Sequence, residues 1–162
     1  MLQLPVFPNW YPFNDMLLDG RLMVGERGVK TRSYDWKYRG PVLLYNSGRT
    51  VNHCVRAYDY PKGHDRHRII VGVAHLEEVR ELTWRELRTM ERNFNNLTSR
   101  QVRLYPWRAE IYPLPVGYFF TRMKRFTKPV PFGWPAGPVK PIFTTIESRS
   151  ELARQLRVVG IR

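Results

Sequence analysis

Two short apolar runs stand out in the hydrophobic pattern of the chain. Residues 41–45 read PVLLY, and residues 69–76 read IIVGVAHL, with β-branched side chains concentrated in the second run. Short apolar runs without polar alternation are typical of strands that are buried on both faces. The turn sequence Asn46-Ser47-Gly48 ends the first run. We therefore predict two core strands, the second of them central in its sheet.

Three segments have the periodicity of short helices. Residues 10–19 place apolar side chains on one face ahead of Gly20, which predicts a helix that ends at this glycine. Residues 83–86 (TWRE) have the spacing of a capping box, and the apolar residues that follow predict an amphipathic helix over about residues 84–97. A second capping box at residues 148–151 predicts a C-terminal helix over about residues 149–158.

The remaining segments carry weaker patterns. Residues 1–9 are rich in proline and are expected to be extended, while residues 22–24 and 28–34 fit a strand or irregular structure. Residues 51–58 fit either a short helix or a strand. Further along, residues 109–112 and 116–123 are strand candidates, and the prolines at 129, 131, 135 and 138 exclude a regular helix.

The charge balance points to a polyanionic partner. The chain has 162 residues with 27 Lys and Arg against 14 Asp and Glu, a net charge of +13. Such a balance favours association with phosphate backbones through counterion release. We expect nucleic acid, RNA or DNA, as the partner. A protein that is merely basic and soluble, or one arm of a larger assembly, is the alternative.

Cysteine usage and hydropathy indicate an intracellular protein. Cys54 is the only cysteine in the sequence, so no internal disulfide can form. The proline-interrupted N-terminus does not resemble a signal peptide, and no apolar run approaches the length of a membrane span. We expect a cytoplasmic protein with no membrane association; its oligomeric state stays open.

A dense basic and aromatic segment precedes the first apolar run and is the leading candidate site. Cations would grip phosphates while a ring of Tyr34, Trp36 or Tyr38 stacks on a base. Side chains alternate along an extended segment, so Lys30, Arg32 and Tyr34 are expected to share one face. The cations predicted to line this basic cleft are Arg27, Lys30, Arg32, Lys37 and Arg39. The alternative is a solvated charged face with Trp36 and Tyr38 in the core.

Other cationic groups are secondary candidates. Lys124, Arg125 and Lys128 lie beside Phe126 and Trp134 on a later segment and extend the predicted nucleic-acid surface. The predicted middle helix carries a stripe of arginines, which is more often simply solvated. The arginines of this stripe are Arg85, Arg88 and Arg92, and those near the C-terminus are Arg149, Arg154, Arg157 and Arg162.

Patterns for catalysis and for metal or cofactor binding are weak, and none is predicted. His64 and His67, even with His53 and Cys54, lack the spacing of a zinc site. No GxSxG, P-loop or GxGxxG sequence occurs. Glu77 and Glu78 follow His75 on the second apolar run and have the chemistry of a general acid or base, but a structural ion pair with Arg80 is favoured.

Three stretches, in order, resemble ASCH domains, the family named for homology to the activating signal cointegrator. They are residues 32–44 (RSYDWKYRGPVLL), residues 70–76 (IVGVAHL) and residues 126–133 (FTKPVPFG). The resemblance covers about residues 20–140 and implies a single α+β domain. Its core would be a small PUA-like β-barrel with three or four helices, preceded by the N-terminal extension 1–9. It also implies a cleft for RNA or modified nucleosides.

The family hallmark, Gly-x-Lys-x-x-Glu-x-Arg, is degenerate in this chain. With Arg32 as the final arginine, the matching positions are Gly25, Arg27 and Lys30, so the lysine becomes arginine and the glutamate becomes lysine. Two cations at these positions favour phosphate or another anionic oxygen as their complement.

A register that begins at Gly28 keeps Lys30 on the lysine but places Ser33 on the glutamate and Asp35 on the arginine. Relatives that act as amidohydrolases on acylated cytidines use a lysine, a hydroxyl at the glutamate position and a distant glutamate. The resemblance therefore implies binding better than turnover. A ribonuclease or amidohydrolase acting on modified nucleosides, and a structural component of a ribonucleoprotein or viral assembly, are the alternatives.

Overall fold

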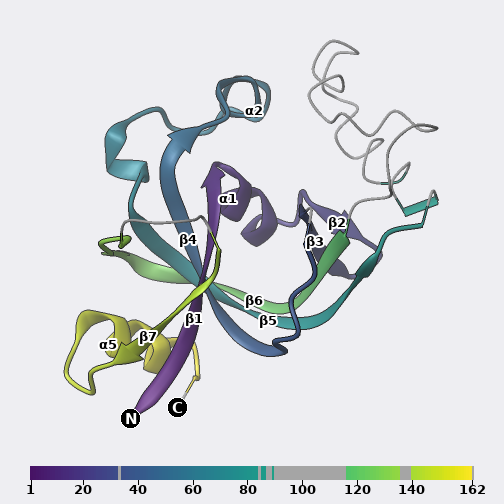
Figure 1. Cartoon of the computed structure of the whole chain (residues 1–162). Coiled ribbons are helices and arrows are strands. Elements are labelled where there is room, and N and C mark those ends of the chain that lie inside the picture. The colour runs from purple at the N-terminus through teal and green to yellow at the C-terminus, as the bar shows by residue number, and fades with distance from the viewer. Residues whose placement is uncertain (33, 84, 87–88, 90–115, 136–139, 162) are drawn as a thin grey trace.

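A curved, seven-stranded mixed sheet in the order β2-β3-β6-β5-β4-β1-β7 organises the chain (Figure 1). The computed structural model describes residues 1–32, 34–83, 85–86, 89, 116–135 and 140–161. The strands are β1 (Leu2–Tyr11), β2 (Met23–Val24), β3 (Arg27–Arg32), β4 (Gly40–Thr50), β5 (Ile69–Glu81), β6 (Val116–Pro131) and β7 (Ile142–Ile146). The labelled helices are α1 (Phe13–Leu18), α2 (Asn52–Ala57) and α5 (Glu151–Val158), and η1 (His64–Arg66) is a short 3-10 turn.

The two predicted core strands are confirmed, and they pair with each other. β4 and β5 run antiparallel in the middle of the sheet, with Val42 opposite Ala74 and Leu43 opposite Val73. Gly72 has a steric role in β5, because a Cβ atom there would lie 2.5 Å from the Lys124 carbonyl oxygen of β6. The β-branched residues around this glycine fill the core on both faces of the sheet, as their pattern predicted.

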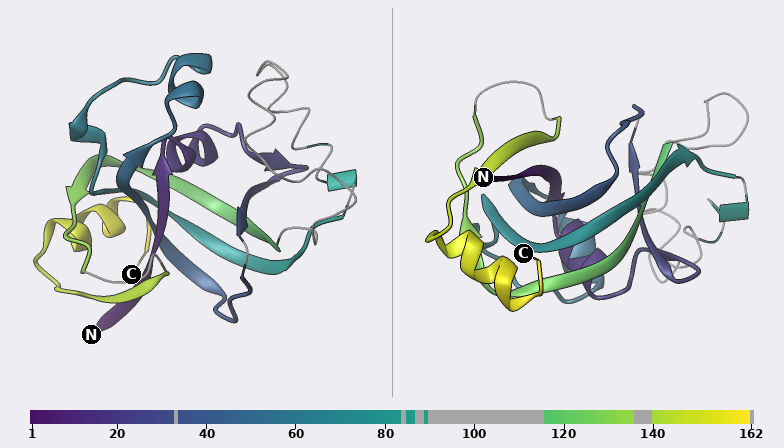
Figure 2. Two further views of the ribbon diagram at one scale, coloured as in Figure 1. Left: turned by 45° about the horizontal axis from the view of Figure 1, so that its top comes forward. Right: turned by 90° about the horizontal axis from the view of Figure 1, so that it is seen from below.

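Successive side chains of β4 enter two different cores, one on each face of the sheet. Val42 and Leu44 pack with α1 residues, whereas Leu43 and Tyr45 pack with α5 residues. Figure 2 shows α5 on the outer side of the curved sheet. The sheet face that packs against α1 is called the α1 face below, and the opposite one the α5 face.

The N-terminal segment is extended, as predicted, and it is an internal strand of the sheet. β1 pairs in parallel with β4 and antiparallel with β7, so it lies between them. The strand continues through Trp10 and Tyr11, where the pattern predicted helix, and α1 begins only at Phe13. Pro12 and the pairing of Tyr11 with Thr50 favour the extended conformation at this junction. β7 was not predicted.

The structure also decides between helix and strand at residues 51–58 and defines the ends of the remaining helices. Residues 52–57 form α2 and not a strand. The C-terminal helix is confirmed, but its N-cap is Ser150, whose hydroxyl accepts a hydrogen bond from Ala153 N (3.1 Å), and not Ser148. The capping box at Thr83 and Glu86 forms with both reciprocal hydrogen bonds (2.8 and 3.2 Å). Most of the predicted helix 84–97 and the strand candidate 109–112 lie outside the described residues.

The α+β class is confirmed, but the predicted barrel is not closed. β2 and β7 are the two ends of the strand order, and no pairing joins them within the described ranges. β2 has only two residues, and β7 pairs only with β1. None of the helices in the described part of the chain has both the length and the apolar character that a membrane span requires.

Candidate nucleic-acid interface

Lys30 is a buried lysine at the centre of β3. Its side chain is 8% exposed and its Nζ lies 3.9 Å from the centre of the Phe13 ring of α1. Burial, helped by the positive charge of Arg32, lowers the pKa of Lys30 to about 7. Among the described residues, no carboxylate forms an ion pair with this amine. Lys30 is therefore a buried amine without an anionic partner in the described part of the chain.

Arg32 lies two residues farther along the same strand and faces the same side. Its guanidinium donates hydrogen bonds to the Pro8 carbonyl and the Asn9 side-chain oxygen of β1, and it lies 4.7 Å from the Phe7 ring. These acceptors are neutral, and loss of hydration lowers the pKa of Arg32. The predicted common face of Lys30 and Arg32 is confirmed, and the two are called the Lys30–Arg32 pair below.

Tyr34 continues this row with an unpaired hydroxyl. The Tyr34 hydroxyl is enclosed and lies close to the Arg32 guanidinium, where it opposes the lowering of the Arg32 pKa by burial, although the two groups do not meet the geometric criteria for a hydrogen bond. The Tyr34 ring contacts the Tyr118 ring edge to face (centroids 6.1 Å apart). The pair thus places its positive charge beside an enclosed phenol hydroxyl.

Two cations that lose hydration without a counter-charge are costly. An isolated buried charge is retained in folded proteins only with compensating contacts. The rings of Phe7 and Phe13 supply part of that compensation through their π faces. A bound anionic oxygen would complete it. Sequence alternation found the pair, but not the side chains of β1 and α1 that surround it.

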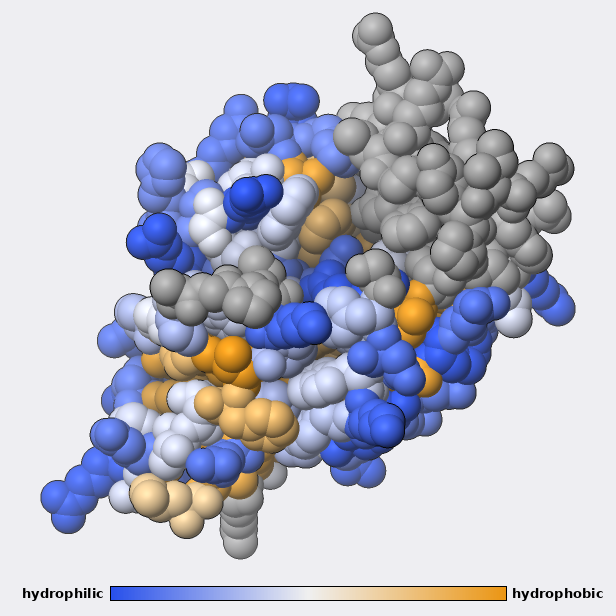
Figure 3. All heavy atoms as spheres, in the orientation of Figure 1, coloured by the Kyte–Doolittle hydropathy of each residue, from blue (hydrophilic) through white to orange (hydrophobic). Residues whose placement is uncertain are grey.

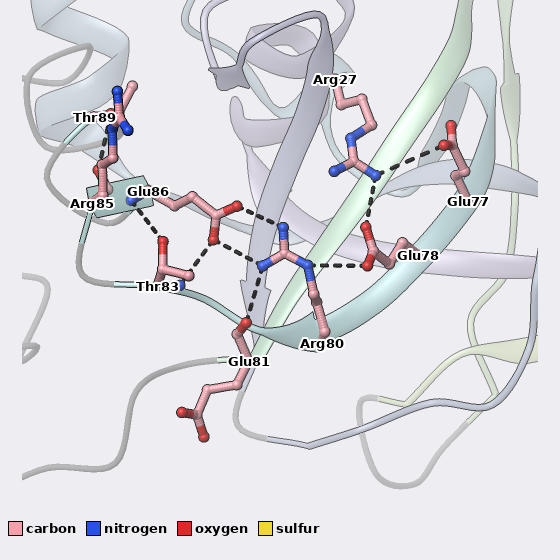
Figure 4. A network of polar contacts seen from close by, with 9 residues as sticks. All are labelled: Arg27, Glu77, Glu78, Arg80, Glu81, Thr83, Arg85, Glu86 and Thr89. Atoms are coloured by element: carbon pink, nitrogen blue, oxygen red, sulfur yellow. Dashed lines mark hydrogen bonds and ion pairs between the residues drawn. The ribbon is translucent and has the colours of Figure 1, made fainter.

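Arg27 lies elsewhere, on the opposite side of β3. Its guanidinium pairs with Glu78 (2.7 Å) and approaches Glu77 (3.7 Å), as Figure 4 shows. It also lies over the Phe119 ring. Arg80 covers the same ring and also pairs with Glu78 (3.0 Å). The prediction that Arg27 lines the same cleft as Lys30 is wrong, whereas the predicted pairing of a strand-end carboxylate with Arg80 is confirmed.

The ion network around Arg80 is expected to make stability depend on acid pH. Hydrogen bonds from Arg80 (2.6 and 2.8 Å) and from Thr83 N lower the pKa of Glu86 to about 2. Because the pKa is lower in the folded than in the unfolded state, the stabilisation is complete above about pH 4.3 and is lost as the pH falls toward 2. Glu86→Gln should cost about 1–2 kcal/mol at pH 6.

Urea unfolding curves between neutral and strongly acid pH would test this. The wild-type and Glu86→Gln free energies of unfolding should converge as the pH falls below 4. Glu147→Gln removes an exposed carboxylate that forms no ion pair within the described residues and should change little. A constant difference between wild type and Glu86→Gln at every pH would contradict the assignment.

The aromatic residues of the basic segment pack against the core. The Trp36 ring stacks on Phe7 (6.3 Å) and on Tyr38 (5.0 Å), and the Tyr38 hydroxyl donates to the Pro41 carbonyl (2.8 Å). Trp36 and Tyr38 are partly buried, and their rings pack against the edge of the core on the α1 face. Among the predicted rings, Tyr34 is the one beside the Lys30–Arg32 pair.

Lys37 and Arg39 lie on the exposed side of the segment. Arg39 donates to the carbonyls of Trp36 (2.6 Å) and Tyr38 (2.7 Å), so it fixes the local backbone. Lys37 makes no hydrogen bond or ion pair with the rest of the described chain. Together with the placement of Arg27, this divides the predicted cleft into an enclosed pair and separate surface cations.

Several of the later cations hold parts of the fold together, and others are exposed. Lys124 donates to the Val159 carbonyl at the end of α5 (2.8 Å). Arg125 pairs with Asp15 and Asp19 of the α1 region, the latter at 2.9 Å, and Lys128 is exposed. Of the other predicted arginines, Arg85 and Arg149 are exposed, Arg154 pairs with Glu151 and Arg157 binds the Ser148 carbonyl. Arg88, Arg92 and Arg162 lie outside the described residues.

Catalytic and metal chemistry finds little support near the pair. Glu77 and Glu78 bind Arg27 on the other side of β3, and Glu26 is exposed. No carboxylate of the described residues therefore lies within hydrogen-bond reach of Lys30. In the same part of the chain, no group of three or more His, Cys, Asp or Glu side chains is arranged to hold a metal ion.

Comparison with solved structures identifies proteins with a similar fold. The chain is similar to the crystal structure of ASCH from Zymomonas mobilis, with 16% identity over 95% of this chain and 93% of that chain and a TM-score of 0.51. A serine-to-alanine mutant of the same protein gives 12% identity over 95% and 94%, with a TM-score of 0.50. The likeness to the N-terminal domain of Staphylothermus marinus McrB is weaker, at a TM-score of 0.41.

Sequence comparison adds no closer relative. Neither a protein-family model nor a curated protein matches the chain. Identities of 12–16% with matching architecture over almost the whole length show a shared fold and nothing finer. The chain therefore shares the fold of the Zymomonas mobilis ASCH structures, as its three sequence stretches predicted.

Proposed function

We propose that the protein binds nucleic acid, RNA before DNA, and that the Lys30–Arg32 pair holds one phosphate of the bound strand. The observation that carries this proposal is the pair itself: a buried lysine beside a half-buried arginine, with no carboxylate partner among the described residues. A phosphate oxygen matches both groups, because charge-assisted hydrogen bonds to lysine and arginine are among the strongest that proteins form.

The surroundings of the pair support a polyanion over a small isolated anion. The whole chain carries a net charge of +13, and Lys37 and Arg39 add exposed positive charge on the segment that follows β3. Hydrophilic side chains dominate the face drawn in Figure 3, where the apolar patches are interrupted by polar neighbours. The net positive charge and the exposed cations after β3 suit a phosphate backbone.

The surroundings of Lys30 favour binding over catalysis. A hydrolase that used Lys30 would need a carboxylate to exchange protons with it, and Glu77 and Glu78 are committed to Arg27. Cys54 is a titratable neighbour, but its thiol is buried and has its pKa raised to about 11. A protonated thiol is a poor nucleophile.

Salt titration of RNA binding tests the electrostatic part of the proposal. The affinity for a single-stranded RNA, measured by fluorescence anisotropy, is expected to fall on the order of tenfold to a hundredfold between about 50 and 200 mM salt. Arg32→Gln should weaken binding about tenfold and make the salt slope shallower.

Arg149→Gln is the matched control, because Arg149 is exposed and distant in sequence from the pair. It should retain the affinity within about twofold. An affinity that does not change with salt would end the proposal. Equal losses in Arg32→Gln and Arg149→Gln would move the binding site away from β3.

A further inference from the structure

A separate hollow lies on the α5 face of the sheet, opposite the Lys30–Arg32 pair. It has a volume of about 370 Å³ and forms where β1, the end of β4, the start of β5 and the segment after β6 meet. The side chains of Pro8, Tyr45, Ser47, Arg68 and Trp134 line it. The volume is within the range of small-ligand sites, and the hollow is called the Arg68 pocket below.

One wall of the pocket is a fixed pair of stacked rings. Tyr45 is 2% exposed, and its ring is nearly parallel to that of Trp134, with centroids 5.2 Å apart and 19° between the planes. The Phe132 ring contacts Tyr45 edge to face (5.6 Å) and locks it from another side. Trp134 is only partly buried. It therefore presents a rigid aromatic surface that a second planar ring can contact.

The cation of the pocket is held by strained backbone. Arg68 has φ +56°, a left-handed conformation that costs energy in any residue other than glycine. Its N–H donates to the Asn46 carbonyl (2.7 Å) and its carbonyl accepts from Phe132 N (3.0 Å), so neighbours on both sides fix this conformation. Figure 1 shows these segments together on the left of the molecule.

The Arg68 guanidinium has unused hydrogen-bonding capacity. It is exposed and forms no ion pair with another described residue. Its Nε lies 3.7 Å from the point where a Cβ on Gly48 would be, so the side chain runs across the turn that follows Ser47. The Ser47 hydroxyl is enclosed and has no hydrogen-bond partner. The five guanidinium donors of Arg68 thus remain available at the pocket, and the enclosed Ser47 hydroxyl lies in its lining.

We propose that the Arg68 pocket binds one unpaired nucleobase, with the base plane against Trp134 and its acceptor edge toward Arg68. Stacking on an aromatic ring and hydrogen bonding to arginine are two common ways in which proteins hold single-stranded bases. Guanine is the best match, because its O6 and N7 accept both hydrogen bonds of one guanidinium. A lone phosphate would leave the aromatic wall without a role. This site is distinct from the Lys30–Arg32 pair and does not depend on the proposed function.

Titration of the full chain with GMP, AMP and ribose 5-phosphate tests the pocket, with calorimetry and tryptophan fluorescence as readouts. GMP should bind most tightly and quench fluorescence, AMP should bind more weakly, and ribose 5-phosphate should bind least. Trp134→Ala should reduce the GMP affinity about tenfold or more, as expected for the loss of a stacking partner. The exposed ring of Phe143 is a control, and Phe143→Ala should leave GMP binding unchanged.

Arg68→Gly is the decisive variant, because it removes the guanidinium while relieving the left-handed strain. Its melting temperature should equal or exceed that of the wild type, and its GMP affinity should fall at least about tenfold. Arg149→Gly removes the same charge elsewhere and should leave GMP binding unchanged. Should Trp134→Ala fail to fold, the result with Arg68→Gly decides.

Three outcomes would overturn the pocket: no GMP binding, equal affinity for GMP and ribose 5-phosphate, or full GMP affinity in Arg68→Gly. The proposed function is tested separately. If RNA binding depends on Lys30 but GMP does not bind, only the base-binding role of the Arg68 pocket is rejected. If GMP binds through Arg68 but RNA affinity is insensitive to salt and to Lys30, only the proposed function falls.

Discussion

Lys30→Met is expected to stabilise the folded protein and to weaken RNA binding, two effects of opposite sign from one substitution. The lysine is 8% exposed and lacks an anionic partner in the described structure, so folding at neutral pH must bury its charge or release its proton. Methionine has a similar length and carries no charge. The gain in the free energy of unfolding at pH 7 should be about 2–4 kcal/mol.

RNA binding should move the other way, because the same side chain contributes half of the proposed phosphate site. A loss of about tenfold or more is expected for one charge-assisted contact. Urea unfolding and fluorescence anisotropy on the same preparations measure both effects.

Lys37→Met is the matched control, since Lys37 is the exposed lysine of the same segment. Its stability should stay within about 0.5 kcal/mol of the wild type. A Lys30→Met protein that is less stable than the wild type would show that the amine has a partner in the fold. Unchanged RNA affinity would remove Lys30 from the site.

RNA affinity is also expected to fall as the pH rises above 7. Burial and Arg32 lower the pKa of Lys30 to about 7 in the free protein, and a bound phosphate would raise it. Binding then takes up a proton, and the affinity should fall by up to tenfold per pH unit above 7. Stability should change in the opposite direction. Between pH 7 and about 10.4 the unfolded chain holds the proton that the folded chain has released, so stability rises with pH.

Anisotropy titrations at constant ionic strength, from about pH 6 to pH 9, would measure the slope, since this range brackets the Lys30 pKa. Lys30→Met should flatten it, whereas Arg32→Gln should bind more weakly but keep a pH dependence. The same slope in wild type and Lys30→Met would assign the titration to another group.

Local sequence patterns predicted two kinds of element: strands that are buried on both faces, and helix ends whose capping hydrogen bonds join residues close in sequence. The apolar runs of β4 and β5 leave no polar face, so they had to become central strands. The capping residues of the middle helix follow from their spacing. By contrast, β1 contains Pro5 and Pro8, and its pairing with β4 depends on residues that lie far away in sequence. No local signal distinguishes such a strand from an extended tail.

The candidate site was predictable to the same extent. Strand alternation correctly placed Lys30 and Arg32 on one face of β3. The same rule puts Arg27 on the opposite face, because it lies an odd number of positions, three, before Lys30. Trp36 does not serve as a stacking platform for a base, because its ring stacks on Phe7 of β1. That contact joins segments far apart in the sequence, so local patterns could not predict it. The same holds for Arg125, whose partners Asp15 and Asp19 lie more than one hundred residues earlier.

The Arg68 pocket shows a different limit of sequence reasoning. Its walls come from four separate segments, and a left-handed arginine has no sequence signature, since this conformation is common only in glycine, asparagine and aspartate.

The position of β1 between β4 and β7 has a consequence for synthesis on the ribosome. Leu2 is paired with Ile146, so β1 acquires its second neighbour only after more than 140 further residues have been synthesised. Until then one edge of β1 offers unpaired amides to other nascent chains. The pairing of β1 with β7 therefore forms later than the pairing of β1 with β4 can form, and slow translation of the residues before β4 would not bring it forward.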